Sequence, residues 1–133
     1  MKTNFFIAFG LLIAFASCAQ TGKQASNREK AEYRKITAQE AKKMLDEHPQ
    51  AILLDVRTEA EFNERHIRGA RLLPLNELAI KAETALSDKN ALILVYCRSG
   101  RRSNSAANLL ISMGYTNIYD IEGGITVWPY STE

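Results

Sequence analysis

The chain has 133 residues, and its 17 basic and 15 acidic side chains give a formal net charge of +2. This length suits one domain with a modest core. The charges nearly balance and no basic run is interleaved with aromatic residues, which excludes a nucleic-acid-binding surface, so we expect no nucleic-acid partner.

The first 17 residues differ in composition from the rest of the chain. Lys2 is followed by an uncharged apolar stretch over residues 5–16, and small residues occupy positions 16–19. A stretch of this length is shorter than the ~20 residues of a membrane-spanning helix, and the pattern is typical of an export signal. We therefore predict a signal peptide over residues 1–17.

Two cleavage sites are compatible with this signal. Residues 15–18 (Phe-Ala-Ser-Cys) resemble a bacterial lipoprotein box, which implies cleavage before Cys18 and lipidation of that cysteine. The protein would then be periplasmic and would touch the membrane only through its lipid anchor. Alternatively, cleavage after Ala19 would leave a soluble periplasmic or secreted protein. The polar segment 18–32 is predicted to be a flexible tether.

Either cleavage leaves Cys97 as the only free thiol of the mature chain. No intramolecular disulfide is then possible, although exported proteins often pair their cysteines. A lone exported cysteine is buried, paired with another molecule or functional.

The first half of the domain alternates helical and extended patterns. Capping boxes at 37–40 and 58–61 predict two helix starts, the second helix ending near His66. The apolar run 51–56 predicts a buried parallel strand. Further along, residues 72–74 predict a short strand stopped by proline, and Asn76 is predicted to cap a helix that runs to about Leu86.

The second half repeats this alternation. Residues 91–96 predict another buried strand, 103–113 a helix stopped at Gly114, and 117–121 a final strand. Gly123-Gly124 predicts a turn and 125–128 a short helical turn. This order indicates an α/β domain with a mainly parallel sheet, in which ligands bind beyond the carboxyl ends of the strands.

Cys97 lies at such a strand end, before a predicted helix start. Unpaired amide groups and the dipole of a helix N-terminus favour negative charge, and Arg98, Arg101 and Arg102 are close in sequence. These features stabilise a thiolate, so Cys97 is predicted to be a nucleophile. The alternative is a small, inert, buried side chain, but the polar, arginine-rich residues that follow Cys97 argue against it.

Several motifs together resemble those of rhodanese-type sulfurtransferase domains. They are residues 53–57 (LLDVR), 61–62 (EF), 66–70 (HIRGA), 96–103 (YCRSGRRS), 114–115 (GY) and 123–128 (GGITVW). One departure is Arg65, where the family often has glycine. The resemblance implies a single domain over residues 33–131, with a five-stranded parallel sheet flanked by helices on both faces.

The resemblance also implies a reaction. Cys97 would take the outer sulfur of an anionic donor such as thiosulfate, carry it as a persulfide and pass it to a thiol, cyanide or a partner protein. No metal or organic cofactor is implied. Of the two arginines at the ends of the active-site loop, Arg102 is expected to contact substrate more directly than Arg98. The substrate-binding residues would be those of this loop: Arg98, Ser99, Gly100, Arg101, Arg102 and Ser103.

Asp55 and Arg57 follow the other buried strand. Two roles are open for them: they line the site or brace its loop, or they form a structural ion pair or strand-end hydrogen bonds, which we favour. His66 is expected to be hydrogen-bonded and structural, because a thiol activated by a helix terminus needs no separate base.

Two rival functions follow from the same residues. Cysteine phosphatases of related architecture place an arginine six positions after the cysteine, where this chain has Ser103. A rhodanese-like module that only binds, or that carries sulfur supplied by a partner protein, is the other alternative. The presence of Cys97 disfavours a module that only binds.

Overall fold

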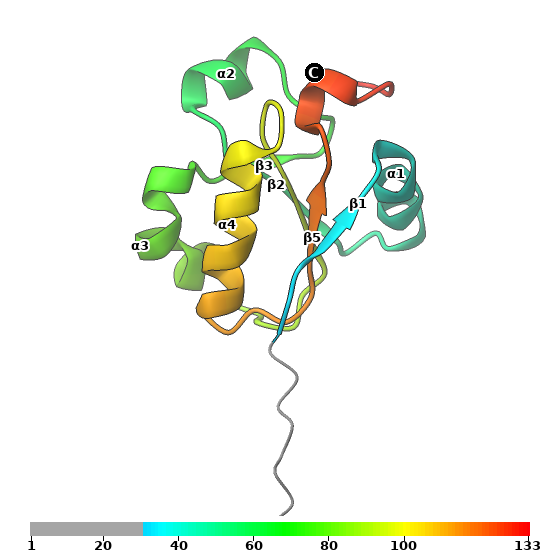
Figure 1. Cartoon of the computed structure of the whole chain (residues 1–133). Coiled ribbons are helices and arrows are strands. Elements are labelled where there is room, and N and C mark those ends of the chain that lie inside the picture. Colours follow the sequence, from blue (N-terminus) through cyan, green and yellow to red (C-terminus); the bar gives the residue numbers. More distant parts are fainter. Residues whose placement is uncertain (1–30) are drawn as a thin grey trace, which may run out of the picture.

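The computed structural model describes residues 31–133 (Figure 1). The predicted signal peptide 1–17, Cys18 and most of the predicted tether 18–32 lie outside the described residues. Within residues 31–133, no helix combines the length and apolar character needed to cross a membrane.

The described residues form one five-stranded sheet with helices between the strands. The sheet order is β1-β5-β4-β2-β3, and every neighbouring pair is parallel. In chain order the elements are β1 (Arg34–Ile36), α1 (Ala38–Glu47), β2 (Ile52–Asp55), α2 (Glu59–Glu64), β3 (Arg71–Leu72), α3 (Leu75–Ala85), β4 (Ile93–Tyr96), α4 (Arg101–Ser112), β5 (Ile118–Ile121) and the 3₁₀ helix η1 (Gly124–Val127). The predicted α/β class with a parallel sheet is confirmed.

Helices cover both faces of the sheet, as expected. Figure 1 shows α3 and α4 on one side of the sheet and α1 on the other. Alternate residues of β4 enter two separate cores: Val95 packs in the core that includes residues of α3 and α4, and Leu94 packs in the core that includes residues of α1 and η1. Burial on both faces explains why the central strands are continuous apolar runs in the sequence.

The two predicted capping boxes are present. The Thr37 hydroxyl accepts a hydrogen bond from the Glu40 amide (3.2 Å), and the Glu40 carboxylate accepts one from the Thr37 amide (2.7 Å). Thr58 and Glu61 make the same pair of bonds, at 3.2 Å to the Thr58 hydroxyl and 3.0 Å to the Glu61 carboxylate. Each box satisfies amide groups that the first helical turn leaves unpaired.

Some predicted boundaries were wrong. Helix α3 begins at Leu75 after Pro74 and has no side-chain cap, so Asn76 does not cap it. Helix α4 begins at Arg101 rather than Ser103, because Gly100 takes a left-handed φ of +115° and turns the chain into the helix early. Strand β1 gave no separate sequence signal, since only Ile36 of its three residues is buried.

Candidate active site

The candidate site lies where β4 ends and α4 begins. Cys97 follows β4 directly, and only three residues separate it from the first residue of α4. Although Cys97 is 1% exposed, it lines a pocket of about 440 Å³. The other lining residues are Leu75, Arg98, Ser99, Arg101, Arg102 and Ser105. The pocket gives a small ligand a route to a thiol that is otherwise buried.

The Cys97 sulfur is surrounded by hydrogen-bond donors. The Gly100 amide donates to Sγ at 3.1 Å, and the Ser103 hydroxyl lies 3.5 Å from Sγ. Burial raises the pKa of the Cys97 thiol, but the Ser103 hydroxyl and the amides of Ser103, Gly100 and Ser99 lower it by more. The net pKa of Cys97 lies below its ordinary value, as expected for a nucleophile held at a helix start.

The turn at Gly123-Gly124, after β5, packs against this loop and its following amides hydrogen-bond to it. The Ile125 and Thr126 amides donate to the carbonyl oxygens of Cys97 (3.0 Å) and Arg98 (3.2 Å). Gly124 has a φ of +57°, and a Cβ there would overlap the Cys97 carbonyl oxygen and come within 2.6 Å of the Arg98 oxygen. A side chain at position 124 would therefore push the turn away from the loop. The sequence predicted this turn but not its contact with Cys97.

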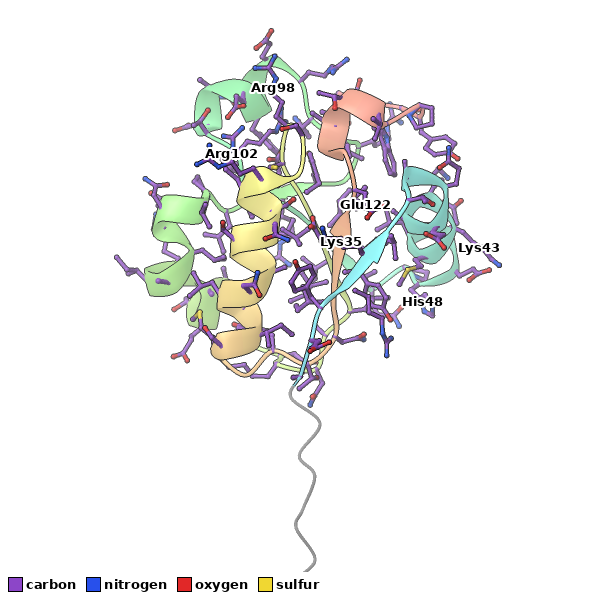
Figure 2. The ribbon with its side chains drawn as sticks, viewed as in Figure 1. Lys35, Lys43, His48, Arg98, Arg102 and Glu122 are labelled. Atoms are coloured by element: carbon purple, nitrogen blue, oxygen red, sulfur yellow. The ribbon has the colours of Figure 1, made fainter. Side chains whose placement is uncertain are left out.

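The three loop arginines have different surroundings. Arg98 and Arg101 are exposed and line the pocket, whereas Arg102 is half-buried on the first turn of α4. Figure 2 shows Arg98 near the tip of the loop and Arg102 beside α4. The loop thus places cationic groups on the rim of the pocket.

Arg102 forms a two-point ion pair with Glu61 of α2. Its two terminal nitrogens donate to the two carboxylate oxygens at 2.7 and 2.8 Å. The Arg102 guanidinium, together with Thr58, lowers the pKa of Glu61 to about 2. Although Arg102 lines the pocket, its donors already have a carboxylate partner; direct contact with a substrate stays a prediction.

The strand beside β4 ends in a closed polar network. Arg57 donates to Asp55 at 2.7 Å and to the Arg65 carbonyl at 2.7 Å. The Tyr96 hydroxyl donates to Asp55 at 2.6 Å and accepts from the Ile67 amide at 3.1 Å. Burial, together with the Asp55 carboxylate, raises the pKa of Tyr96.

This network forms the structural ion pair expected for Asp55 and Arg57. Arg57 also lines a second pocket of about 380 Å³, which shares Leu75 and Arg102 with the Cys97 pocket. The sequence reasoning missed Tyr96. Its position directly before Cys97 could have indicated a role at this strand end. Side chains alternate along a strand, so Tyr96 points to the opposite face of the sheet from Cys97.

His66 is hydrogen-bonded and packed, as expected. Its Nδ1 lies 2.9 Å from the Phe62 carbonyl oxygen, and its ring stacks on that of Phe62 at 3.7 Å between centroids. Its backbone also pairs with that of Glu133. These contacts join the end of α2 to the last residues of the chain and account for the imidazole without a catalytic role.

The sheet and the amide-lined cysteine loop define a class of α/β domain with a nucleophile after a central parallel strand. Residues 37–129 match the family model described as the rhodanese-like domain, and the chain belongs to this family.

Named relatives agree with this assignment. Thiosulfate sulfurtransferase PspE of Escherichia coli is 39% identical over 70 residues, which is 53% of this chain and 67% of that protein. Thiosulfate sulfurtransferase GlpE of Tolumonas auensis is 33% identical over 100 residues, 75% of this chain and 92% of that protein. Among solved structures, the rhodanese-like domain of the Anabaena protein Alr3790 has a TM-score of 0.69 at 31% identity, covering 74% of this chain and 77% of that one.

Proposed function

We propose that this protein is a sulfurtransferase that carries sulfur as a persulfide on Cys97. The observation that supports the proposal most directly is the sulfur environment: a thiol with a lowered pKa, bonded by the Gly100 amide and lining a pocket with Arg98 and Arg101. The named relatives are thiosulfate sulfurtransferases, which supports thiosulfate as a donor of suitable chemistry.

The reaction has two steps. In the first, the Cys97 thiolate attacks the outer sulfur of thiosulfate, the S–S bond of the donor breaks, and sulfite leaves with the bonding electron pair. In the second, an acceptor nucleophile such as cyanide or a thiolate attacks the outer sulfur of the persulfide, and the Cys97 thiolate is restored. Both steps are nucleophilic displacements at sulfur and require no external oxidant or reductant.

The loop supplies the stabilisation that these steps need. Negative charge lies on Sγ in the thiolate, where the Gly100 amide and the Ser103 hydroxyl lie, and on the adjoining outer sulfur in the persulfide. The exposed Arg98 and Arg101 add positive charge on the rim, which attracts an anionic donor.

Ser103 disfavours a phosphatase. It occupies the position where the cysteine phosphatases carry their phosphate-binding arginine, and its hydroxyl donates to the Gly100 carbonyl at 3.1 Å. Arg102, one residue earlier, is engaged by Glu61. A phosphate group would therefore lack its two-point clamp at the expected place.

The experiment is intact mass spectrometry of the purified protein after incubation with thiosulfate. We expect a gain of one sulfur atom that is lost on adding cyanide and is absent from Cys97→Ser. Since the two residues differ by one atom, Cys97→Ser should fold with nearly the wild-type unfolding midpoint. A folded, reduced wild-type protein that gains no sulfur would contradict thiosulfate as donor and favour the carrier supplied by a partner protein.

We further propose that the protein is exported and anchored in the periplasm through lipidated Cys18, as the sequence of residues 1–18 predicts. The test is labelling with a fatty-acid probe in a bacterial host, comparing the wild type with Cys18→Ser. Labelling should be lost in the variant, and the protein should move from the membrane to the soluble fraction. Unchanged labelling and membrane retention in Cys18→Ser would refute the anchor.

A further inference from the structure

The ion pair between Glu61 of α2 and Arg102 of α4 lies at the edge of the Cys97 pocket. Arg102 lines that pocket and also the neighbouring pocket of about 380 Å³. Glu61 lines a further pocket of about 520 Å³, which shares Arg98 with the Cys97 pocket. Neither side chain is fully buried: 27% of Glu61 and 33% of Arg102 is exposed. The pair therefore belongs to the surface that an anionic substrate meets.

Glu61 is fixed beside the pocket by its own helix. Its Oε2 accepts hydrogen bonds from the Thr58 amide and the Thr58 hydroxyl, each at 3.0 Å, within the capping box that begins α2. The two terminal nitrogens of Arg102 donate to the two oxygens of this carboxylate. Two parallel bonds to one carboxylate are a strong arrangement for a guanidinium. A substrate oxyanion that approached the same two nitrogens would have to displace a carboxylate that the fold itself holds in place.

Arg102 differs in this respect from the other arginines of the pocket. Of the three arginines that line the Cys97 pocket, only Arg102 has a carboxylate partner within residues 31–133. Its charge is balanced, whereas the charges of Arg98 and Arg101 are available to an incoming anion. Helix α2 carries a second carboxylate, Glu64, which is exposed and lines the same pocket as Glu61. Within residues 31–133, Glu64 forms no ion pair, so Glu61 alone of these two carboxylates engages a pocket arginine.

We propose that Glu61 is a specificity-determining residue that withholds Arg102 from anionic substrates of the Cys97 site. While Glu61 is engaged, an anionic donor is attracted by Arg98 and Arg101, and Arg102 together with Glu61 adds no net charge. The pair thus lowers the affinity of the pocket for anions and reduces the advantage of a highly charged donor over a less charged one. This inference rests on the proposed function for the donor and deepens it, because it assigns the residue that sets the charge preference of the site.

The test compares two alkylating reagents that differ in charge. Iodoacetate is an anion and iodoacetamide is neutral, and the Cys97 thiolate displaces iodide from either reagent as a carbon–sulfur bond forms. The ratio of the two rate constants, measured at one neutral pH by mass spectrometry, is independent of the fraction of Cys97 that is ionised. This ratio therefore reports how strongly the pocket attracts an anion, and it requires no sulfur donor.

Glu61→Gln keeps the size of the side chain and can still accept from Thr58, but it removes the charge that engages Arg102. We expect the iodoacetate-to-iodoacetamide ratio to rise about threefold, the size of effect typical of a partly exposed ion pair. Glu64→Gln is the matched control, because it removes the same charge from the same helix, and it should change the ratio much less. The KM for thiosulfate should also fall in Glu61→Gln.

An Arg102→Gln background separates two ways in which Glu61 could act. If Glu61 acts by engaging Arg102, Glu61→Gln should raise the ratio much less in this background than in the wild type. Three results would overturn the proposal: no rise in Glu61→Gln, an equal rise in Glu64→Gln, or a rise that is undiminished in Arg102→Gln.

Glu61→Asp provides a second test if Glu61→Gln does not fold. It keeps the charge but shortens the side chain by one methylene, which weakens the two-point pairing with Arg102. The ratio should then rise part of the way, and an unchanged ratio would refute the proposal. If thiosulfate fails to load Cys97 while the ratios behave as expected, only the proposed function fails. If thiosulfate loads Cys97 and the ratios do not change, only this inference fails.

Discussion

The ends of β2 and β4 lie side by side in the sheet, yet their polar groups are arranged in opposite ways. At the end of β2, the Asp55 carboxylate is neutralised by Arg57 and bonded by Tyr96. At the end of β4, the Cys97 sulfur is held by a backbone amide and a hydroxyl, and it faces a pocket. The first arrangement closes a network of side chains around a charge. The second gives one sulfur atom stabilising contacts on one side and leaves it open to the pocket on the other.

The two strand ends therefore differ in their capacity to bind a ligand. Charged side chains that satisfy one another hold their positions but have little capacity left for a ligand. Amides fixed in a loop keep their direction whatever the charge on sulfur, so they can stabilise a thiolate and would also stabilise the proposed persulfide. Three substitutions test this difference between the two strand ends.

The largest effect is expected at Gly124, which supports the β4 end. Gly124→Ala would combine a strained positive φ with overlap against the Cys97 and Arg98 carbonyls, at a cost of about 3 kcal/mol in unfolding free energy. Gly69→Ala is the matched control: it has a positive φ of 82° but meets nothing within 4 Å, so about 1 kcal/mol is expected. Urea denaturation measures both, and equal losses would show that the close contact with the loop is unimportant.

An intermediate effect is expected at Tyr96, which closes the β2 end. Tyr96→Phe would leave the Asp55 oxygen and the Ile67 amide short of a partner in the core, at a cost of about 1–3 kcal/mol. The control is Tyr119→Phe, which removes a hydroxyl that accepts a hydrogen bond from exposed Arg34 and should cost less than about 0.5 kcal/mol. Thermal or urea unfolding distinguishes them, and an unperturbed Tyr96→Phe would argue that the network is dispensable.

The smallest effect is expected at Glu61, which joins the two ends through Arg102. Its folded pKa of about 2 lies below the ordinary 4.5, so the pair stabilises the fold above about pH 4.5 and loses this contribution as the pH falls toward 2. Since both side chains are partly exposed, we expect about 1 kcal/mol.

Glu61→Gln should therefore lose less stability than the wild type between pH 4.5 and 2, as measured by urea denaturation across this range. The control is Glu47→Gln, which removes an exposed partner of Lys43 on α1. The same pH dependence in wild type and Glu61→Gln would contradict the role of the pair.

Local patterns in the sequence were enough to predict most of the architecture. The capping boxes at Thr37 and Thr58 depend on neighbours within one helical turn, and the buried strands are visible as apolar runs. The edge strand β1 could not be found this way, because an edge strand with one buried residue has no continuous apolar pattern. The start of α3 was missed because Pro74, with its fixed φ, begins the helix without a side-chain cap.

The sequence by itself determined the α/β class and was enough to predict a nucleophilic role for Cys97, because both depend on residues close together in the chain. The tertiary structure decided which groups surround that thiol. The turn at Gly124 packs against its carbonyl, and Glu61 engages Arg102. These partners come from separate strands and helices, and they meet only because parallel strands bring distant segments to one edge of the sheet.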